Sequence, residues 1–132
     1  MSNEELIDLA IRAREKAYVP YSNFKVGAIL ISENESFYEG ANMECSSYGM
    51  SVCAERVALL KALYAGERKF KKLVVVAGKE ENLEYTTPCG ACRQFLADFG
   101  VDIEVICGYY KDGKIQYKSF SLRELLPENF IL

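Results

Sequence analysis

Two short segments carry the side chains best suited to chemistry. Their sequences are Cys53-Ala54-Glu55 and Pro88-Cys89-Gly90-Ala91-Cys92, which together supply three thiols and one carboxylate. The chain contains no histidine, so the usual proton shuttle and the usual nitrogen ligand of zinc are both missing. Metal binding and proton transfer would therefore fall to cysteine and to acidic side chains.

The three thiols suggest an open zinc site. Three thiolates leave one tetrahedral position of Zn²⁺ for water, whereas a structural site is usually closed by a fourth protein ligand. The i, i+3 spacing of Cys89 and Cys92 places both sulfurs on one side of a helical turn. We expect one zinc ion per chain, held by Cys53, Cys89 and Cys92. Glu55 would then shuttle a proton between zinc-activated water and the substrate.

Arg56 adds a charge that such a site needs. Three thiolates around Zn²⁺ carry net negative charge, which weakens the metal as a Lewis acid. A guanidinium beside them can hydrogen-bond the sulfurs and withdraw electron density. The alternative for Arg56 is an ordinary surface arginine on a helix.

The other cysteines leave two alternatives open. Cys45 or Cys107 could close a structural zinc site as a fourth ligand, and a Cys-x-x-Cys pair also occurs in thioredoxin-like redox proteins. Cys107 ends an apolar run and is expected in the core. An odd total of five cysteines argues against a disulfide framework.

Length and charge narrow the class of protein. A chain of 132 residues suits one domain, spanning 1–132. A net charge of −3 and one dense basic run, Arg68-Lys69-Phe70-Lys71-Lys72, disfavour binding to a nucleic acid polymer. The polar N-terminal residues and the lack of a long apolar run predict a soluble, cytoplasmic protein with no membrane partner.

Periodicity predicts the elements that position these side chains. We expect a first helix, capped by Asn3 and ending before Val19, and a hairpin of strands 26–31 and 37–42. The cysteine segments begin helices 53–65 and 88–99, the second capped by Thr87, and a helix N-terminus favours the thiolate form. Strands 73–78, 103–107 and 114–120 and a short helix 122–126 complete the pattern. It predicts an α/β fold, a three-layer α/β/α domain with a mixed five-stranded sheet.

With these residues in view, the chain resembles the small, three-cysteine, homotetrameric cytidine deaminases. The resemblance rests on Cys53-Ala54-Glu55-Arg56 and Pro88-Cys89-Gly90-Ala91-Cys92-Arg93-Gln94, a known signature of zinc nucleobase deaminases. It extends over segments 20–28, 40–44 and 124–127. It implies a cytidine deaminase-like fold and hydrolytic deamination of cytidine and 2′-deoxycytidine to the uridine forms, with release of ammonia, as in pyrimidine salvage.

The resemblance also implies substrate-binding residues and a shared site. Asn42 and Glu44 would bind the ribose hydroxyls, and Phe24 would contact the pyrimidine ring. Ala54 and Tyr48 are further substrate-binding candidates. Phe130 would reach into the site of a neighbouring subunit of a homotetramer.

Two rival functions remain at this stage. One is deamination of another cytosine nucleoside, such as blasticidin S, although Asn42 and Glu44 favour an ordinary ribose or deoxyribose. The other is a non-catalytic interaction module stabilised by zinc. The chain departs from the family at Cys45-Ser46, where Asn-Ala is common, and this affects the expected surroundings of the 5′-hydroxyl.

Overall fold

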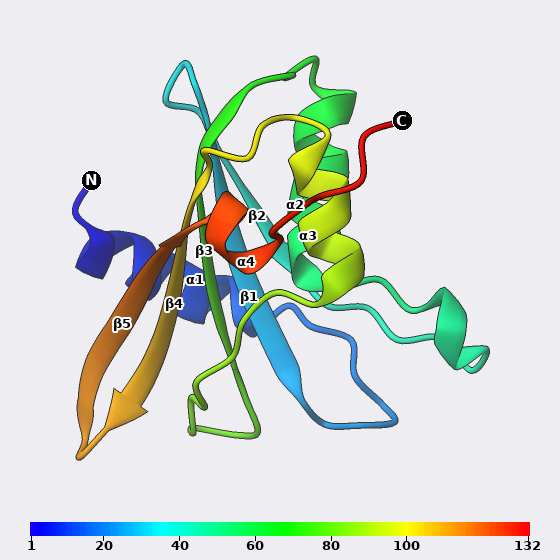
Figure 1. Ribbon diagram of the computed structural model, residues 1–132. Coiled ribbons are helices and arrows are strands. Elements are labelled where there is room, and N and C mark those ends of the chain that lie inside the picture. Colours follow the sequence, from blue (N-terminus) through cyan, green and yellow to red (C-terminus); the bar gives the residue numbers. More distant parts are fainter.

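A mixed sheet of five strands, in the order β2-β1-β3-β4-β5, forms the centre of the molecule. The computed structural model describes residues 1–132 (Figure 1). The strands are β1 (Lys25–Ser32), β2 (Phe37–Ala41), β3 (Phe70–Gly78), β4 (Glu104–Lys111) and β5 (Lys114–Ser121). The helices are α1 (Asn3–Arg14), α2 (Ala54–Tyr64), α3 (Gly90–Ala97) and α4 (Leu122–Leu125), with a 3₁₀ turn, η1, at Tyr48–Met50.

Strand pairing follows the lengths of the connections. β1 pairs antiparallel with both β2 and β3, and β4 pairs antiparallel with β5. β3 and β4 are parallel, so the chain between them must cross over the sheet, and α3 lies in that crossover. Asp112 and Gly113, with φ of 54° and 75°, close the β4–β5 hairpin in the left-handed backbone region that such tight turns require. The predicted hairpin of strands 26–31 and 37–42 is confirmed.

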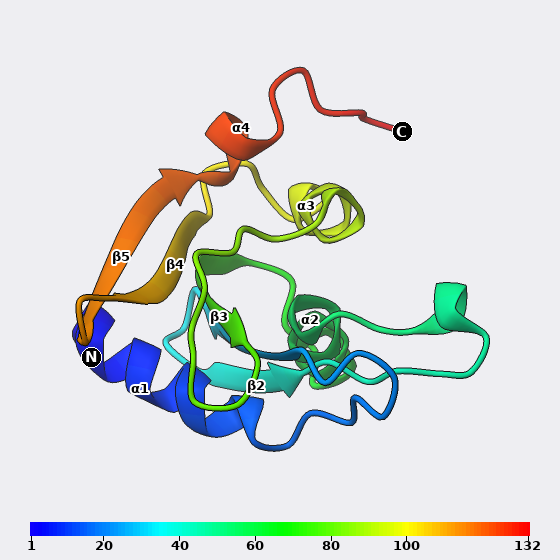
Figure 2. The ribbon, with the colours of Figure 1, turned by 90° about the horizontal axis from the view of Figure 1, so that it is seen from below.

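Alternate residues of the strands face two separate apolar layers. In β1, Ala28 and Leu30 pack in the layer that contains α2, whereas Ile29 and Ile31 pack in the layer that contains α1. Figure 2 shows α1 on one side of the sheet and α2 and α3 on the other. The predicted three-layer α/β/α arrangement is therefore confirmed. None of the helices has the length and apolar character needed to cross a membrane.

The predicted caps of α1 and α3 are wrong. Ser2, and not Asn3, caps α1: its hydroxyl accepts from the Glu5 amide at 3.1 Å, and the Glu5 carboxylate accepts from the Ser2 amide at 3.0 Å. The helix ends at Arg14, a turn earlier than expected. In α3 the N-cap is Cys89 rather than Thr87, so the helix starts two residues later than predicted.

The packing of α2 on the sheet fixes where the cysteines lie. A side chain on Gly40 would meet the Ala54 carbonyl oxygen at 2.2 Å, so glycine in β2 lets the first turn of α2 approach the sheet closely. The N-termini of α2 and α3 both lie at the end of the sheet where β1 begins and β3 ends (Figure 1). The two cysteine segments are thereby brought together.

Candidate metal centre and active site

Three cysteine sulfurs meet at the N-termini of α2 and α3. Cys89 Sγ lies 3.6 Å from Cys53 Sγ and 3.5 Å from Cys92 Sγ, and all three sulfurs lie within 4.8 Å of one another. Two thiolates about 2.3 Å from a tetrahedral zinc ion would be about 3.8 Å apart. The spacing and the chemistry of the donors therefore fit one zinc ion.

Cys53 and Cys89 occupy helix-capping positions without acting as caps. Both have extended backbone, with φ, ψ of −68°, 153° and −67°, 165°, and neither side chain accepts a bond from its helix. An oxygen-bearing residue at these positions would turn inward to bond an amide of the first turn. The sulfurs remain available to a metal ion, and the positive ends of two helix dipoles favour their thiolate forms.

The remaining cysteines do not join this group. Cys107 is fully buried in the apolar layer under α2, and burial raises its pKa to about 12, so the prediction of a core residue is confirmed. Cys45 is half-buried and lies outside the cluster of sulfurs. The arrangement gives no support to a site closed by a fourth cysteine.

Glu55 is buried beside the sulfurs, in the first turn of α2. Only 4% of the residue is exposed. Burial raises its pKa to about 7, and the negative charge of a Cys53 thiolate acts in the same direction. A carboxyl group with a pKa near neutrality can both take up and release a proton.

Arg56 is tied to the same segment. Its Nη2 donates to the Ser51 carbonyl at 3.1 Å and lies 3.9 Å from Cys53 Sγ, while its Nε is buried with no partner. The neighbouring Cys92 thiol and the Arg56 guanidinium together hold the pKa of Cys53 well below its usual range. The contact with sulfur is the one expected of an arginine that offsets thiolate charge.

The two ribose candidates, Asn42 and Glu44, join neighbouring loops. Asn42 Oδ1 accepts from the Val26 amide at 2.8 Å, and its Nδ2 donates to the Phe24 carbonyl at 2.9 Å. Glu44 Oε1 accepts from the amides of Tyr21 and Ser22 at 3.0 and 3.1 Å. These side chains therefore hold the loop before β1 against the segment that leads to α2.

The Ser22 contact was missed by the sequence analysis. Its hydroxyl donates to Glu44 Oε2, and the Tyr48 hydroxyl lies 3.4 Å from the same oxygen. Burial alone would raise the pKa of Glu44, but the bonds from Ser22 and the Tyr21 amide outweigh it, and the pKa is lowered. The signal available in the sequence was the run of turn-forming polar residues after Pro20, because the backbone N–H groups of a turn can donate to a carboxylate.

The other substrate-binding candidates do not form a cluster like that of Asn42 and Glu44. Ala54 is fully buried as the first residue of α2, Phe24 is half-buried, and Tyr48 is 60% exposed and packs edge-to-face on Tyr21. Phe130 is 63% exposed, and its carbonyl accepts from Gln94 Nε2 at 3.0 Å. The apolar tail thus lies along α3, with its side chains largely uncovered in one chain.

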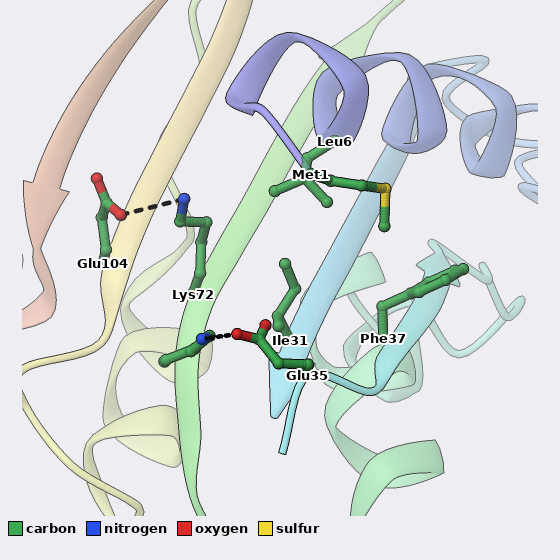
Figure 3. A pocket seen from close by; sticks show the side chains of 8 residues that line it. Met1, Leu6, Ile31, Glu35, Phe37, Lys72 and Glu104 are labelled. Carbon is green, nitrogen blue, oxygen red and sulfur yellow. Dashed lines mark hydrogen bonds and ion pairs between the residues drawn. The ribbon is translucent and has the colours of Figure 1, made fainter. Parts of the chain in front are cut away.

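A separate cavity lies at the other end of the sheet. It has a volume of about 560 Å³, and its lining includes Leu6, Ile31 and Phe37 (Figure 3). Lys71 is paired with Glu35, and Lys72 Nζ lies 3.4 Å from Glu104 Oε1. Two of the charged pairs in this cavity are thus already satisfied, and none of the candidate site residues lines it.

Comparison with known proteins places the chain in a family. Residues 1–108 match the model of the cytidine and deoxycytidylate deaminase zinc-binding region. The chain is 43% identical over 133 residues to a probable cytidine deaminase of Dictyostelium discoideum, covering 98% of this chain and 86% of that protein. It is 45% identical over 131 residues to the cytidine deaminase of Halalkalibacterium halodurans, covering 98% and 95%.

Solved structures agree with these sequence matches. The crystal structure of cytidine deaminase from Burkholderia pseudomallei superposes with a TM-score of 0.85 at 42% identity, over 98% of this chain and 100% of that one. The enzyme from Mycobacterium tuberculosis gives 0.80 at 30% identity, over 100% and 99%. The chain therefore belongs to the cytidine and deoxycytidylate deaminase family, which confirms the resemblance.

Proposed function

We propose that this chain is a zinc-dependent cytidine deaminase. It converts cytidine and 2′-deoxycytidine to uridine and 2′-deoxyuridine and releases ammonia. The observation that carries the proposal is the cluster of Cys53, Cys89 and Cys92 sulfurs beside the buried Glu55, in a chain that matches cytidine deaminases over nearly its whole length. The reaction is proposed for one catalytic domain, residues 1–132, in the cytoplasm, where thiols stay reduced.

Cys53, Cys89 and Cys92 would hold one zinc ion per chain, which when bound supplies a Lewis acid that lowers the pKa of water. Glu55 then acts as the proton carrier. Its carboxylate oxygen takes a proton from the attacking water and passes it to the ring nitrogen N3 of the cytosine. It next takes the second proton from the new hydroxyl group on C4 and gives it to the amino group, so that the C–N bond breaks, ammonia departs and the C4 carbonyl of uracil forms. The near-neutral pKa of the buried carboxyl suits both transfers.

Arg56 would keep Cys53 in place and offset part of the thiolate charge. The 3.9 Å approach of its Nη2 to Cys53 Sγ supports this role. A ligand whose charge is partly neutralised donates less electron density to the metal, which preserves the acidity of the bound water.

Asn42 and Glu44 would bind the ribose hydroxyls. Asn42 Nδ2 has one N–H beyond its bond to Phe24. Glu44 stays ionised, and a ribose hydroxyl would replace the long 3.4 Å contact of the Tyr48 hydroxyl on its Oε2. Phe24, Tyr48 and the backbone of Ala54 would contact the base and sugar. An ordinary ribose or deoxyribose suits this amide and carboxylate better than the sugar of blasticidin S.

We further propose a homotetramer in which sites are shared between subunits. Leu60 and Tyr64 on the outer side of α2 are 48% and 97% exposed, and Ile131 near the end of the tail is 81% exposed. Exposed apolar groups of this kind favour burial against another copy. Phe130 would then complete a neighbouring site.

Incubating the purified protein with cytidine and following the loss of cytosine absorbance tests the function. We expect turnover that a Glu55→Gln control lacks, with slower or no turnover of blasticidin S. A protein that retains one zinc ion per chain but leaves cytidine and blasticidin S unchanged would be a zinc-stabilised module instead. Faster turnover of blasticidin S would reassign the substrate.

A further inference from the structure

The guanidinium of Arg93, in α3, makes three hydrogen bonds to two separate segments. Nε donates to the Pro88 carbonyl at 2.7 Å, and Nη2 donates to the Thr87 hydroxyl at 2.8 Å. Nη1 donates to the Leu125 carbonyl at 2.7 Å. The side chain therefore joins the residues just before Cys89 to the end of α4.

The bond to Pro88 bears directly on Cys89. The Pro88 carbonyl and the Cys89 nitrogen belong to the same planar peptide unit, so fixing that oxygen fixes the plane from which the Cys89 Cα and sulfur project. Proline has no N–H through which this segment could be held. The Arg93 amide also donates to the Cys89 carbonyl at 3.0 Å, so one residue holds the backbone on both sides of the sulfur.

The need for such an anchor follows from the exposure of Cys89. Cys89 is exposed, whereas Cys53 is half-buried and Cys92 is buried. No side chain caps α3, and Thr87, which could have bonded a helix amide, bonds Arg93 instead. Packing alone therefore holds Cys89 less firmly than the other two cysteines.

At its other end, the guanidinium satisfies a carbonyl of a very short helix. α4 has four residues, and its last carbonyls have no partners inside the helix. A planar fork with donors in fixed directions can bond Pro88, Thr87 and Leu125 at once, which a lysine ammonium on a flexible stem cannot.

We propose that Arg93 is a positioning residue that sets the Cys89 sulfur for zinc binding and ties it to the C-terminal segment. This inference rests on the proposed zinc site, and it concerns binding of the metal rather than the chemical steps. Loss of the three bonds would let the Cys89 peptide rotate and would release the metal faster, while the apolar core stays intact.

The test compares Arg93→Met with Arg68→Met as a matched control. Arg68 also donates to two backbone carbonyls, those of Leu63 and Glu67, at 2.9 and 2.7 Å, but it does so at the far end of α2. Zinc release to a chromogenic chelator should be about 10- to 100-fold faster in Arg93→Met and unchanged in Arg68→Met. The thermal midpoint of the zinc-free protein should shift by a similar amount in both variants.

Two more variants extend the test of Arg93. Arg93→Lys should release zinc nearly as fast as Arg93→Met, and wild-type behaviour of Arg93→Lys would show that charge alone suffices and overturn the proposal. Thr87→Val removes one of the three hydrogen bonds with little change of shape and should release zinc several-fold faster than wild type. This variant replaces Arg93→Met in the test if Arg93→Met does not fold. Equal release rates in wild type, Arg93→Met and Thr87→Val would also overturn it.

The cobalt-substituted proteins separate this proposal from the zinc site itself. The sulfur-to-cobalt charge-transfer bands of Arg93→Met should differ from those of wild type in position or intensity. An unaltered spectrum would contradict a displaced Cys89 sulfur. If wild type takes up neither zinc nor cobalt, the proposed metal site fails. If wild type binds one ion but Arg93→Met matches Arg68→Met in release rate and spectrum, only the role of Arg93 fails.

Discussion

The two helices that carry the cysteines begin alike but differ in their surroundings. Cys53 and Cys89 each precede a helix with the same extended backbone. α2 has 11 residues and packs on the sheet, so that Glu55 in its first turn is 4% exposed. α3 has 8 residues, and its first residue, Gly90, and Cys89 are exposed. The same extended backbone thus precedes a buried carboxyl group on α2 and a solvent-exposed first turn on α3.

The arginine contacts of the two helices sharpen this difference. Arg56 on α2 bonds the Ser51 carbonyl and lies near the Cys53 sulfur itself. Arg93 on α3 bonds the Pro88 carbonyl, the Thr87 hydroxyl and the Leu125 carbonyl. Arg56 places a positive charge beside the Cys53 sulfur. Arg93 instead holds the backbone next to Cys89.

The largest expected effect comes from replacing Glu55, the proposed proton carrier on α2. Glu55→Gln fills the same space but cannot move a proton, so kcat should fall by about 10² to 10⁴-fold while zinc stays bound. Steady-state kinetics and metal analysis of the same preparation measure both quantities. Retention of more than about a tenth of wild-type turnover would remove Glu55 from the mechanism.

Arg56→Gln should have a smaller effect on the same helix. It removes charge beside Cys53 without removing a ligand, so turnover should fall by about 10- to 100-fold at full zinc occupancy. Comparison with Arg93→Met separates the two arginines, because Arg56→Gln should act mainly on turnover and Arg93→Met mainly on zinc release. Unchanged rate and unchanged zinc affinity would make Arg56 a simple surface residue.

Deleting residues 128 to 132 probes the C-terminal segment that lies along α3. The bond between Gln94 and the Phe130 carbonyl is lost, and so is the aromatic ring proposed to close a neighbouring site. Stacking of this kind contributes about 0.5 to 1.5 kcal/mol beyond buried area, so the KM for cytidine should rise several-fold. Sedimentation should show a looser oligomer with zinc in place. A truncated tetramer with wild-type kinetics would assign the tail to packing alone.

The smallest expected effect is a pH-dependent change in the free energy of unfolding when Glu44 is replaced. Its folded-state pKa is lowered, so the ionised carboxylate stabilises the fold above the unfolded value, near pH 4.3, and this contribution is lost as the pH falls through the folded value. Glu44→Gln should therefore be less stable than wild type at pH 7, and the difference should narrow on acidification. Urea denaturation of both proteins at several pH values measures it; a constant difference would refute the lowered pKa.

The sequence predicted most of the fold because its signals are local. Unbroken apolar runs at 26–31 and 73–78 marked strands. The Ala- and Leu-rich stretch after Cys53 marked one helix, and Pro88 at the start and Gly100 at the end marked the other. The cap of α1 was predicted wrongly although a local signal was present: Ser2 and Asn3 are both good N-caps, but only Ser2 is followed three residues later by a glutamate, Glu5, that completes a capping box. In the structure Asn3 is engaged by Lys72 Nζ at 2.8 Å, across 69 residues of chain.

The candidate site was predictable where chemistry restricts the residue type. Cys53, Cys89 and Cys92 could be named because few side chains bind zinc when histidine is absent. The contact of Ser22 with Glu44 and the bonds of Arg93 could not be named. They depend on loops that meet only after the sheet forms, and serine and arginine have many ordinary roles on a surface.

X-ray absorption at the zinc edge tests the central claim most directly, because it counts the ligands of the metal in the purified protein. Zinc held by Cys53, Cys89 and Cys92 should give three sulfurs at about 2.3 Å and one lighter atom at about 2.0 Å, with one zinc ion per chain. The Cys45→Ala and Cys107→Ala proteins should give the same spectrum. Four sulfurs around zinc, or a chain purified without zinc that still deaminates cytidine, would contradict it.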